Sequence, residues 1–339
     1  MVLADAGDVA GSSLPGAHTL SALGEDAVLA RILPRLRPAV AALIGPGDDG
    51  AVVAASGGRF VVSTDTMVHG PDFRLAWHTP RELGWKAAAT NLTDIAAMGA
   101  RPTAMTVAIT APSDTDVVVL EGIAEGIQEC LDALAPGAGV VGGDLTSSPV
   151  LTIAVTVFGD LAGEPVRRSG ARVGDIVAHA GLLGAAARGL ALLFDGARDA
   201  SGEPDIALAC ALRARHPDLI AAQLAPRPPV LAGVAAALAG ATAMIDVSDG
   251  LARDARRVAV ASGVAVDFAS DALGPDVNLA LAGAEDHGLL AAFPPDARLP
   301  DSFRPIGRVV PGVGHVLLDG VIVDSVGWDP YLNWDGRAG

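Results

Sequence analysis

The sequence predicts an α+β fold divided into two halves of about 150 residues each. With 339 residues, the chain is longer than a single hydrophobic core usually serves. Its apolar fraction of 51% is high enough to build two such cores. Strand and helix patterns are mixed without strict alternation, which disfavours a regular βαβ succession. We expect a disordered tail over residues 1–20, an N-terminal domain over 21–160 and a C-terminal domain over 161–339.

The first half is expected to contain helices separated by β-branched strands. Residues 21–36 carry Leu, Val and Ile at helical spacing, with Ser21 as a candidate N-cap. A helix over 80–99 starts with Pro80 in its first turn and stops at Gly99, which suits the position after a helix. The remaining elements are a helix over 116–134, strands over 59–68, 103–112 and 151–162, and a strand within 138–148 that runs into a glycine turn.

The second half follows a charged, glycine-rich stretch over residues 164–175, which is typical of a linker. The uncharged run 228–245 is borderline in length for a membrane span. Gly240 divides this run into a helix and a buried strand, so membrane insertion is not expected. The expected elements are strands within 175–181, 243–250 and 264–270, and helices over 182–196, 230–239 and 251–263.

The charge and cysteine content exclude several classes of partner. A formal net charge of −16 repels nucleic acids and anionic membranes, so neither is an expected partner. Cys130 and Cys210 lack the spacing of a zinc site or a disulfide framework, so we expect a cytoplasmic location. Lys86 is the only lysine in the chain, and a general bias toward arginine explains this without any catalytic role.

Aspartates recur where apolar segments meet short polar ones. In several of these segments a strand leads into a Gly, Ser, Thr or Asp turn, and strand ends commonly bind ligands. A single aspartate in a turn more often caps a turn or a helix, but so many together favour a shared site. The aspartates concerned are Asp48, Asp49, Asp65, Asp94, Asp144, Asp246 and Asp249.

The chemistry of these segments favours magnesium and phosphate. Carboxylate and hydroxyl oxygens suit Mg²⁺, whereas zinc would require His or Cys. Gly142 and Gly143 could offer backbone amides to phosphate, although close packing explains them equally well. The sequence has no P-loop and no protein-kinase signature, so phosphoryl transfer would use another scaffold. Arg168 is a candidate contact for nucleotide phosphate, the alternative being an exposed linker charge.

Eight segments occur in an order typical of one enzyme family: GDDGAVV, STDTMV, NLTDIAAMGARP, GGDLT, RSGAR, IDVSDG, AEDHGLL and GWDPY. Over about residues 21–331 the chain therefore resembles thiamine-monophosphate kinase, of the superfamily of aminoimidazole-ribotide synthetase and selenophosphate synthetase. NLTDIAAMGARP and IDVSDG are the specific motifs. The resemblance implies a two-domain aminoimidazole-ribotide synthetase-like fold with a C-terminal α/β sandwich. It also implies a homodimer in which the N-terminal mixed sheets form a barrel.

The resemblance further implies transfer of the γ-phosphoryl group of ATP to thiamine monophosphate, without a phosphoenzyme and with several Mg²⁺ ions. Metal ligation would fall on Asp49, Ser63, Thr64, Asp65, Asp94, Asp144, Asp246 and Asp249, with Asp94, Asp246 and Asp249 as the catalytic set. ATP contacts would fall on Gly143, Asp144, Arg168 and Ser248. Thiamine phosphate contacts would fall on Asp72, Glu285 and Trp328. The Trp328 indole could stack on the flat thiazolium cation, the alternative being burial of a C-terminal flap.

The chain departs from the family pattern in three places. Asp72 stands where many members have a histidine, Gly288 replaces a usual acid, and a tail LNWDGRAG follows the last motif. The metal end is intact, so we expect in-line attack by the acceptor phosphate on the γ-phosphorus. The alternatives are another ATP-using enzyme of the superfamily and a catalytically reduced ATP-binding regulatory protein. Selenophosphate synthetases carry a reactive cysteine or selenocysteine near the N-terminus, and this chain has no cysteine there.

Overall fold

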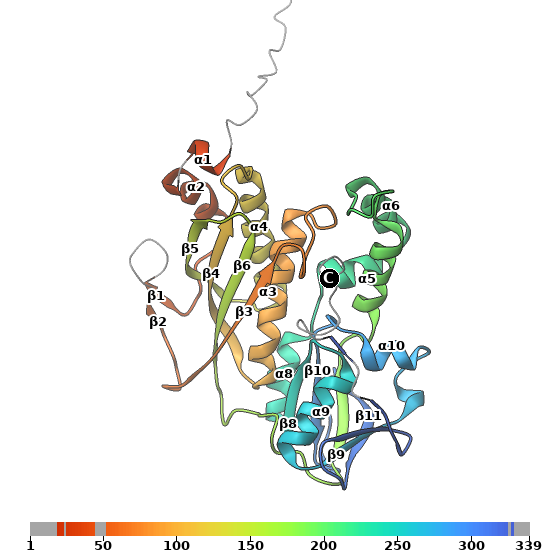
Figure 1. Ribbon diagram of the computed structural model, residues 1–339. Coiled ribbons are helices and arrows are strands. Elements are labelled where there is room, and N and C mark those ends of the chain that lie inside the picture. The colour runs from red at the N-terminus through yellow and green to blue at the C-terminus, as the bar shows by residue number, and fades with distance from the viewer. Residues whose placement is uncertain (1–18, 24, 45–51, 325–326, 329–339) are drawn as a thin grey trace, which may run out of the picture.

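The computed structural model describes residues 19–23, 25–44, 52–324 and 327–328. The fold is α+β, with two main sheets and helix α3 (Pro80–Ala97) lying between them (Figure 1). Most of the expected tail over 1–20 lies outside the described residues, as do Asp48 and Asp49. No helix in the described ranges is long and apolar enough to cross a membrane.

The N-terminal sheet has four strands in the order β3-β6-β4-β5. β4 and β5 run parallel, whereas the other two pairs are antiparallel. A parallel pair needs a crossover connection, and α4 provides it while packing against α3. The elements of this half are α1 (Leu20–Leu23), α2 (Glu25–Ile32), η1 (Leu33–Arg35), β1 (Ala42–Ile44), β2 (Val52–Val53), β3 (Phe60–Val68), β4 (Arg101–Ala111), α4 (Val117–Leu134), β5 (Gly139–Ser147) and β6 (Thr152–Asp160).

Helix α3 has strong signals at both ends, which explains why its bounds match the expectation. Thr79 caps it, because its hydroxyl accepts from the Glu82 amide at 3.2 Å and the Glu82 carboxylate accepts from the Thr79 amide at 2.8 Å. Pro80 occupies the first turn, and Gly99 follows the helix with a φ of 73°. The chain therefore turns sharply from α3 into β4.

Two glycines let α3 and α4 approach backbone to backbone. A Cβ at Gly84 would overlap the carbonyl oxygen of Ile123, and one at Gly126 would overlap that of Arg81. Neither position tolerates a side chain without moving a helix, because the obstacle is backbone rather than a flexible side chain. This contact fixes the position of α3 over the N-terminal sheet.

The C-terminal sheet has seven strands in the order β13-β12-β9-β11-β7-β10-β8. Its strands pair antiparallel except for β12 and β9, which are parallel. The elements of this half are β7 (Ile176–Ala180), α5 (Ala185–Gly196), α6 (Ile206–Arg215), α7 (Pro217–Leu224), α8 (Val230–Leu238), β8 (Ala243–Val247), α9 (Leu251–Ser262), β9 (Ala265–Phe268), η2 (Ser270–Ala272), α10 (Val277–Ala282), β10 (Gly288–Phe293), β11 (Arg304–Val310), β12 (His315–Leu318) and β13 (Val321–Ile322).

Both faces of this sheet's centre are buried, against different helices. In β10, Leu289 and Phe293 belong to the core shared with α3 and α8. Leu290 and Ala292, which alternate with them, belong to the core under α9 and α10. Successive strand residues point to opposite faces, so one strand serves two cores.

His179 on β7 is a buried histidine, and neither ring nitrogen has a hydrogen-bond partner. Burial lowers its pKa to about 3, with Arg304 adding to the shift. A Cβ at Gly288 would overlap the His179 ring. The departure from the family pattern at Gly288 therefore makes room for the His179 ring.

Helices α5, α6 and α7 form a separate small cluster around Trp77. The Trp77 indole donates to the Ala197 carbonyl at 2.9 Å, which ties the cluster to the loop before α3. The sequence predicted α5 but not α6 or α7. Two signals were present: Asp205 caps α6 through the Leu208 amide, and Pro217 opens α7.

Three sequence expectations are wrong in detail. Ser21 lies inside α1 rather than capping a helix, and Thr19 takes the capping role by accepting from the Ala22 amide. β5 continues through the expected glycine turn as far as Ser147, so Asp144 lies within a strand. The strand expected over 59–68 is confirmed as β3, but Asp65 lies inside it and not at its end.

Gly126→Ala should lower the free energy of unfolding by about 1–3 kcal/mol, because the new methyl forces α3 and α4 apart. Chemical denaturation measures this loss. Gly163→Ala is the matched control, since a Cβ there meets nothing within 4 Å. Equal stabilities for the two variants would contradict the close helix contact.

Acid should destabilise the fold partly through His179. Its folded pKa lies below the unfolded value of 6.5, so the unfolded chain binds more protons as the pH falls below 6.5. The expected loss from this group is about 2 kcal/mol at pH 5. His179→Leu should lose less stability between pH 7.5 and pH 5 than the natural chain in urea titrations. An unchanged pH dependence would refute this role.

Candidate functional site

A cavity of about 360 Å³ lies where the two halves meet, and polar side chains from both halves line it. β3 contributes Ser63, α3 contributes Asp94 and β8 contributes Asp246. The connecting segment contributes Arg168, together with its neighbours Arg167 and Ser169. The Ser63 hydroxyl donates to the Asp94 carboxylate at 2.6 Å, so β3 and α3 are joined inside the cavity. The structure therefore brings together four of the residues that the sequence singled out.

Asn91, one turn before Asp94, holds β3 in place. Its side-chain oxygen accepts from the Asp65 amide at 3.1 Å, and its nitrogen donates to the Ala87 carbonyl at 2.9 Å. Residues three apart share a face of a helix, so Asn91 and Asp94 both face β3. Sequence reasoning passed over Asn91, although it belongs to the NLTD segment.

Burial and mutual repulsion shift the pKa values of two acids at this site. Burial raises the pKa of Asp94 to about 7, and the carboxylates of Asp246 and Asp65 add to the shift. Burial followed by Asp246 also raises the pKa of Asp65. Among the described residues, no three acidic, His or Cys side chains stand close enough to hold an ion as they are. The donor set is nevertheless oxygen-rich and electron-rich, which suits a hard cation.

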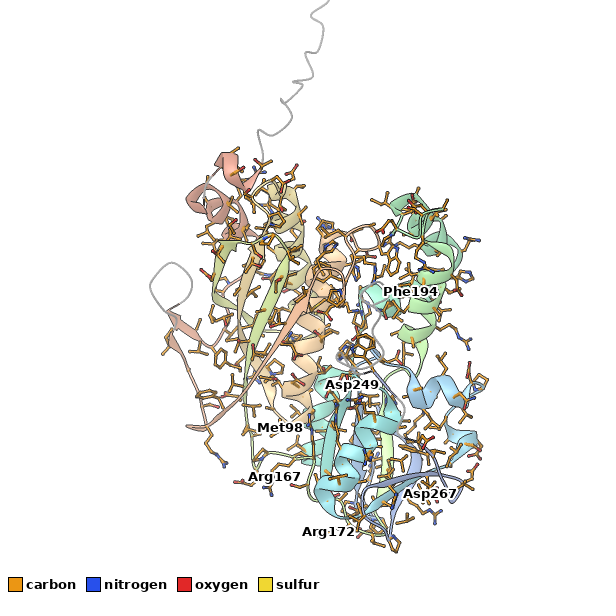
Figure 2. The ribbon with its side chains drawn as sticks, viewed as in Figure 1. Met98, Arg167, Arg172, Phe194, Asp249 and Asp267 are labelled. Carbon is orange, nitrogen blue, oxygen red and sulfur yellow. The ribbon has the colours of Figure 1, made fainter. Side chains whose placement is uncertain are left out.

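Asp249 lies at the start of α9, near the centre of the molecule (Figure 2). Arg257 donates to its carboxylate at 2.6 Å, and Arg253 lies 3.7 Å away. Its backbone carbonyl accepts from the Trp328 amide at 2.8 Å, so the C-terminal segment reaches the site. Asp254 accepts from the Asp249 amide at 3.0 Å and fixes the turn. The structure thus places Trp328 beside Asp249, with its side chain half-buried.

Lys86 is a functional candidate that the sequence could not identify. Its side chain is 2% exposed, and its ammonium lies 2.6 Å from the Glu285 carboxylate. The same ammonium donates to the Gln223 carbonyl on α7 at 3.2 Å. Burial alone would raise the pKa of Glu285, but Lys86 and then His287 lower it overall. The only sequence signal was a single lysine in an alanine-rich helix.

The loop that carries Glu285 has an unusual backbone. Glu285 and His287 have φ values of 73° and 51°, and the Glu285 amide donates to the Ser248 carbonyl at 2.8 Å. Non-glycine residues rarely adopt positive φ, so surrounding contacts must hold them there. His287 lies 3.8 Å from Asp246. Burial alone would lower the pKa of His287, but Asp246 and Glu285 raise it overall.

Asp72 lies on the same side as Glu285. Its carboxylate accepts from the Val68 amide at 2.7 Å, which closes the turn after β3. Burial raises the pKa of Asp72; the Val68 amide opposes this shift and the charge of Glu285 adds to it. Asp72 therefore has a structural role in the turn and contributes negative charge near Glu285.

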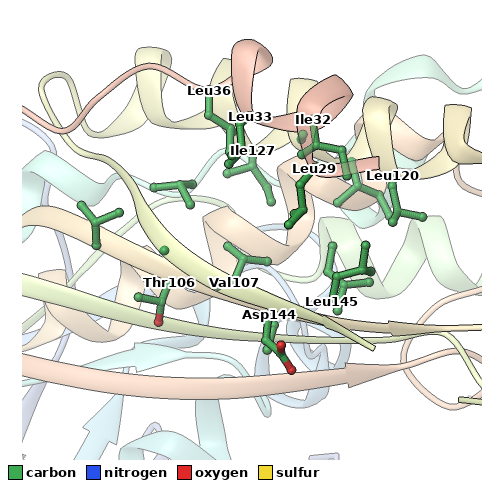
Figure 3. A pocket seen from close by; sticks show the side chains of 18 of the residues that line it. Leu29, Ile32, Leu33, Leu36, Thr106, Val107, Leu120, Ile127, Asp144 and Leu145 are labelled. Carbon is green, nitrogen blue, oxygen red and sulfur yellow. The ribbon is translucent and has the colours of Figure 1, made fainter. Parts of the chain in front are cut away.

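Thr64 and Asp144 face away from the carboxylate cavity. Ser63 points to α3, so its neighbour Thr64 points to the other face, where it bonds to Thr156 at 3.0 Å. Asp144 shares that face through its register with β4 and lines a separate, mainly apolar cavity of about 620 Å³ (Figure 3). Gly143 precedes it in β5. The described geometry does not bring these three residues to Asp94.

Comparisons with known proteins point to one family. Residues 47–161 match the family model described as AIR synthase related protein, N-terminal domain. A thiamine-monophosphate kinase from Mycobacterium tuberculosis (strain ATCC 25618 / H37Rv) is 42% identical over 332 residues, which cover 93% of this chain and 92% of that protein.

Solved structures agree in fold. Thiamine-monophosphate kinase from Stenotrophomonas maltophilia K279a superposes with a TM-score of 0.70 at 31% identity, covering 88% of this chain and 96% of that one. A structure described as AaThiL complexed with AMPPCP and TMP gives a TM-score of 0.69 at 30% identity, covering 83% and 90%. The chain therefore belongs to the thiamine-monophosphate kinase family.

Proposed function

We propose that this chain transfers the γ-phosphoryl group of ATP to thiamine monophosphate, giving thiamine diphosphate and ADP. The observation that carries the proposal is the pair of carboxylates of Asp94 and Asp246, which line one cavity together with Arg168. Burial and the nearby charges of Asp246 and Asp65 jointly raise the pKa of Asp94. Mutually repelling acids beside a guanidinium suit a ligand that brings both phosphate and divalent metal. Membership of the thiamine-monophosphate kinase family supports the same substrates.

The cavity can supply an oxygen-rich metal site from its own side chains. Ser63, Asp94 and Asp246 line the cavity, and Asp65 and Asp249 lie close enough to share its electrostatics; these are the described residues that would hold Mg²⁺. Mg²⁺, when bound, neutralises phosphate charge and orients the phosphates for in-line displacement. Asp49, Thr64 and Asp144 remain proposed ligands: Asp49 lies outside the described residues, and the other two face away.

The residues around the cavity have distinct tasks. Arg168 would bind phosphate oxygens on the side opposite the carboxylates, and Ser248 and Gly143 remain proposed nucleotide contacts. The acceptor is a phosphate monoester that is largely ionised near neutral pH, so it needs positioning more than a general base. Glu285 and Asp72 would face the thiazolium cation, on which the Trp328 indole could stack.

We also propose a homodimer, joined through the N-terminal sheet. The face of β3 away from α3 carries Phe60 and Val62, which are 57% and 53% exposed. The neighbouring strand β6 adds Phe158 beside Phe60, with ring centroids 5.8 Å apart. A sheet with apolar side chains on both faces favours a second layer, which another copy would supply. The domain boundary near residue 160 and a cytoplasmic location remain proposals too.

Asp94→Asn should lower turnover by about a hundredfold or more, because it removes negative charge where phosphate and metal meet. Asn can still accept from Ser63, so the fold should survive. The assay mixes protein, ATP, Mg²⁺ and thiamine monophosphate and measures thiamine diphosphate. Asp195→Asn, on the exposed side of α5, is the matched control and should match the natural chain. No product from the natural chain would refute the function, and a near-normal Asp94→Asn rate would refute the site.

Lys86→Met should lower the free energy of unfolding by about 2–3 kcal/mol, because it leaves Glu285 without its buried partner. It should also raise KM for thiamine monophosphate more than KM for ATP, since Glu285 belongs to the acceptor end. The double variant Lys86→Met/Glu285→Gln should regain part of the lost stability. Additive losses in the double variant would contradict a coupled pair.

A further inference from the structure

A second pocket opens beside the carboxylate cavity, and arginines dominate it. Its volume is about 520 Å³, and its lining residues are Arg168, Arg253, Arg256, Arg257, Val260 and Ala261. It adjoins the carboxylate cavity, because Arg168 and Ala261 line both. A concentration of four guanidiniums stands out in a chain whose net charge is −16.

Local structure builds this arginine pocket. Arg253, Arg256 and Arg257 are spaced by three and four residues on α9, so they lie on neighbouring positions of one helix surface. Ser262, at the end of α9, donates to the Arg168 carbonyl at 3.0 Å and accepts from the Gly170 amide at 3.1 Å. The segment that carries Arg168 is thereby fastened to the helix that carries the other three arginines.

The pocket keeps an excess of positive charge. Arg257 is paired with Asp249 and Asp254 at 2.6 Å and 2.5 Å, and Asp249 also attracts Arg253. Arg168 and Arg256 have exposed side chains, and the described residues offer neither of them an acidic partner within salt-bridge distance. Among the described residues, Arg168 and Arg256 therefore remain open to an anion with several charges.

We propose that this arginine pocket binds an oligophosphate chain and leads it into the carboxylate cavity. The inference rests on the proposed function, since it gives the phosphates of the donor nucleotide a path past Arg168. Guanidinium forks match phosphate oxygens in pairs, and several of them suit a chain of phosphates better than a single anion. The acidic remainder of the surface repels a long polyanion such as nucleic acid. Arg256 lines the arginine pocket but not the carboxylate cavity, and no acidic side chain among the described residues forms an ion pair with it.

The test measures calorimetric affinity for inorganic tripolyphosphate and, separately, for ATP with Mg²⁺. Arg256→Gln should weaken both by about fivefold or more, and Arg256→Glu should weaken both further. Arg215→Gln, at the end of α6 and far from α9 in Figure 1, removes an equal exposed charge and should leave both affinities unchanged. The effect of Arg256 should shrink at high salt.

Each remaining outcome is decisive. If Arg256→Gln bound tripolyphosphate as tightly as the natural chain, the proposed binding pocket would be wrong. An equal loss of affinity in Arg215→Gln would also contradict the proposal, because it would indicate a general surface charge effect. A loss of affinity for ATP but not for tripolyphosphate would also contradict the proposal, because Arg256 would then contact the nucleoside. If the natural chain formed thiamine diphosphate but Arg256→Gln had unaltered affinities, the binding role of the pocket would be refuted and the proposed kinase activity would be retained. If tripolyphosphate binding depended on Arg256 but the chain formed no thiamine diphosphate, the kinase activity would be refuted and the binding role of the pocket would be retained.

Discussion

The ion pair between Lys86 and Glu285 is the contact on which the arrangement of the site depends. Burying an ammonium group costs free energy unless oxygen atoms surround it, so Lys86 requires oxygen-bearing groups as its neighbours. Its partners come from the loop before β10 and from α7, two segments far apart in the sequence. Three parts of the molecule therefore meet at one charge. The positive φ of Glu285 shows that the loop accepts an unfavourable backbone to reach that position.

Helix α3 fixes the distance between this ion pair and the carboxylate cavity. Lys86 and Asp94 are eight residues apart, which corresponds to about 12 Å along an α-helix. One rigid element thus carries both Lys86, at the proposed acceptor end, and Asp94, in the carboxylate cavity. The glycine contact with α4 and the Asn91 bond to β3 prevent this helix from sliding, so neither end can move without the other.

Periodic, strongly capped elements could be predicted from the sequence, and elements defined by tertiary contacts could not. β3, α3, α4 and α9 show clear patterns, whereas α6 and α7 are short and pack on α5 and on each other around Trp77. At the site, motif chemistry predicted Asp94 and Asp246, and the family resemblance added Ser63; these three residues line one cavity. It missed Lys86, since one lysine makes no pattern and only its buried partner reveals a role. The strand expected over 59–68 already implied that Thr64 points away from Ser63, because successive strand residues face opposite sides.

The buried faces of β10 raise a question of folding specificity. In most strands a slip by one residue exposes apolar side chains to water, and that penalty selects the register. Here both faces are apolar, so hydrophobicity cannot tell the right alignment from the wrong one. Side-chain shape must therefore select the register, because a slip by one residue would place Phe293 in a space that fits only an alanine. Since Leu289 pairs with Asp246, the volume of one phenylalanine helps to decide where the Asp246 carboxylate lies.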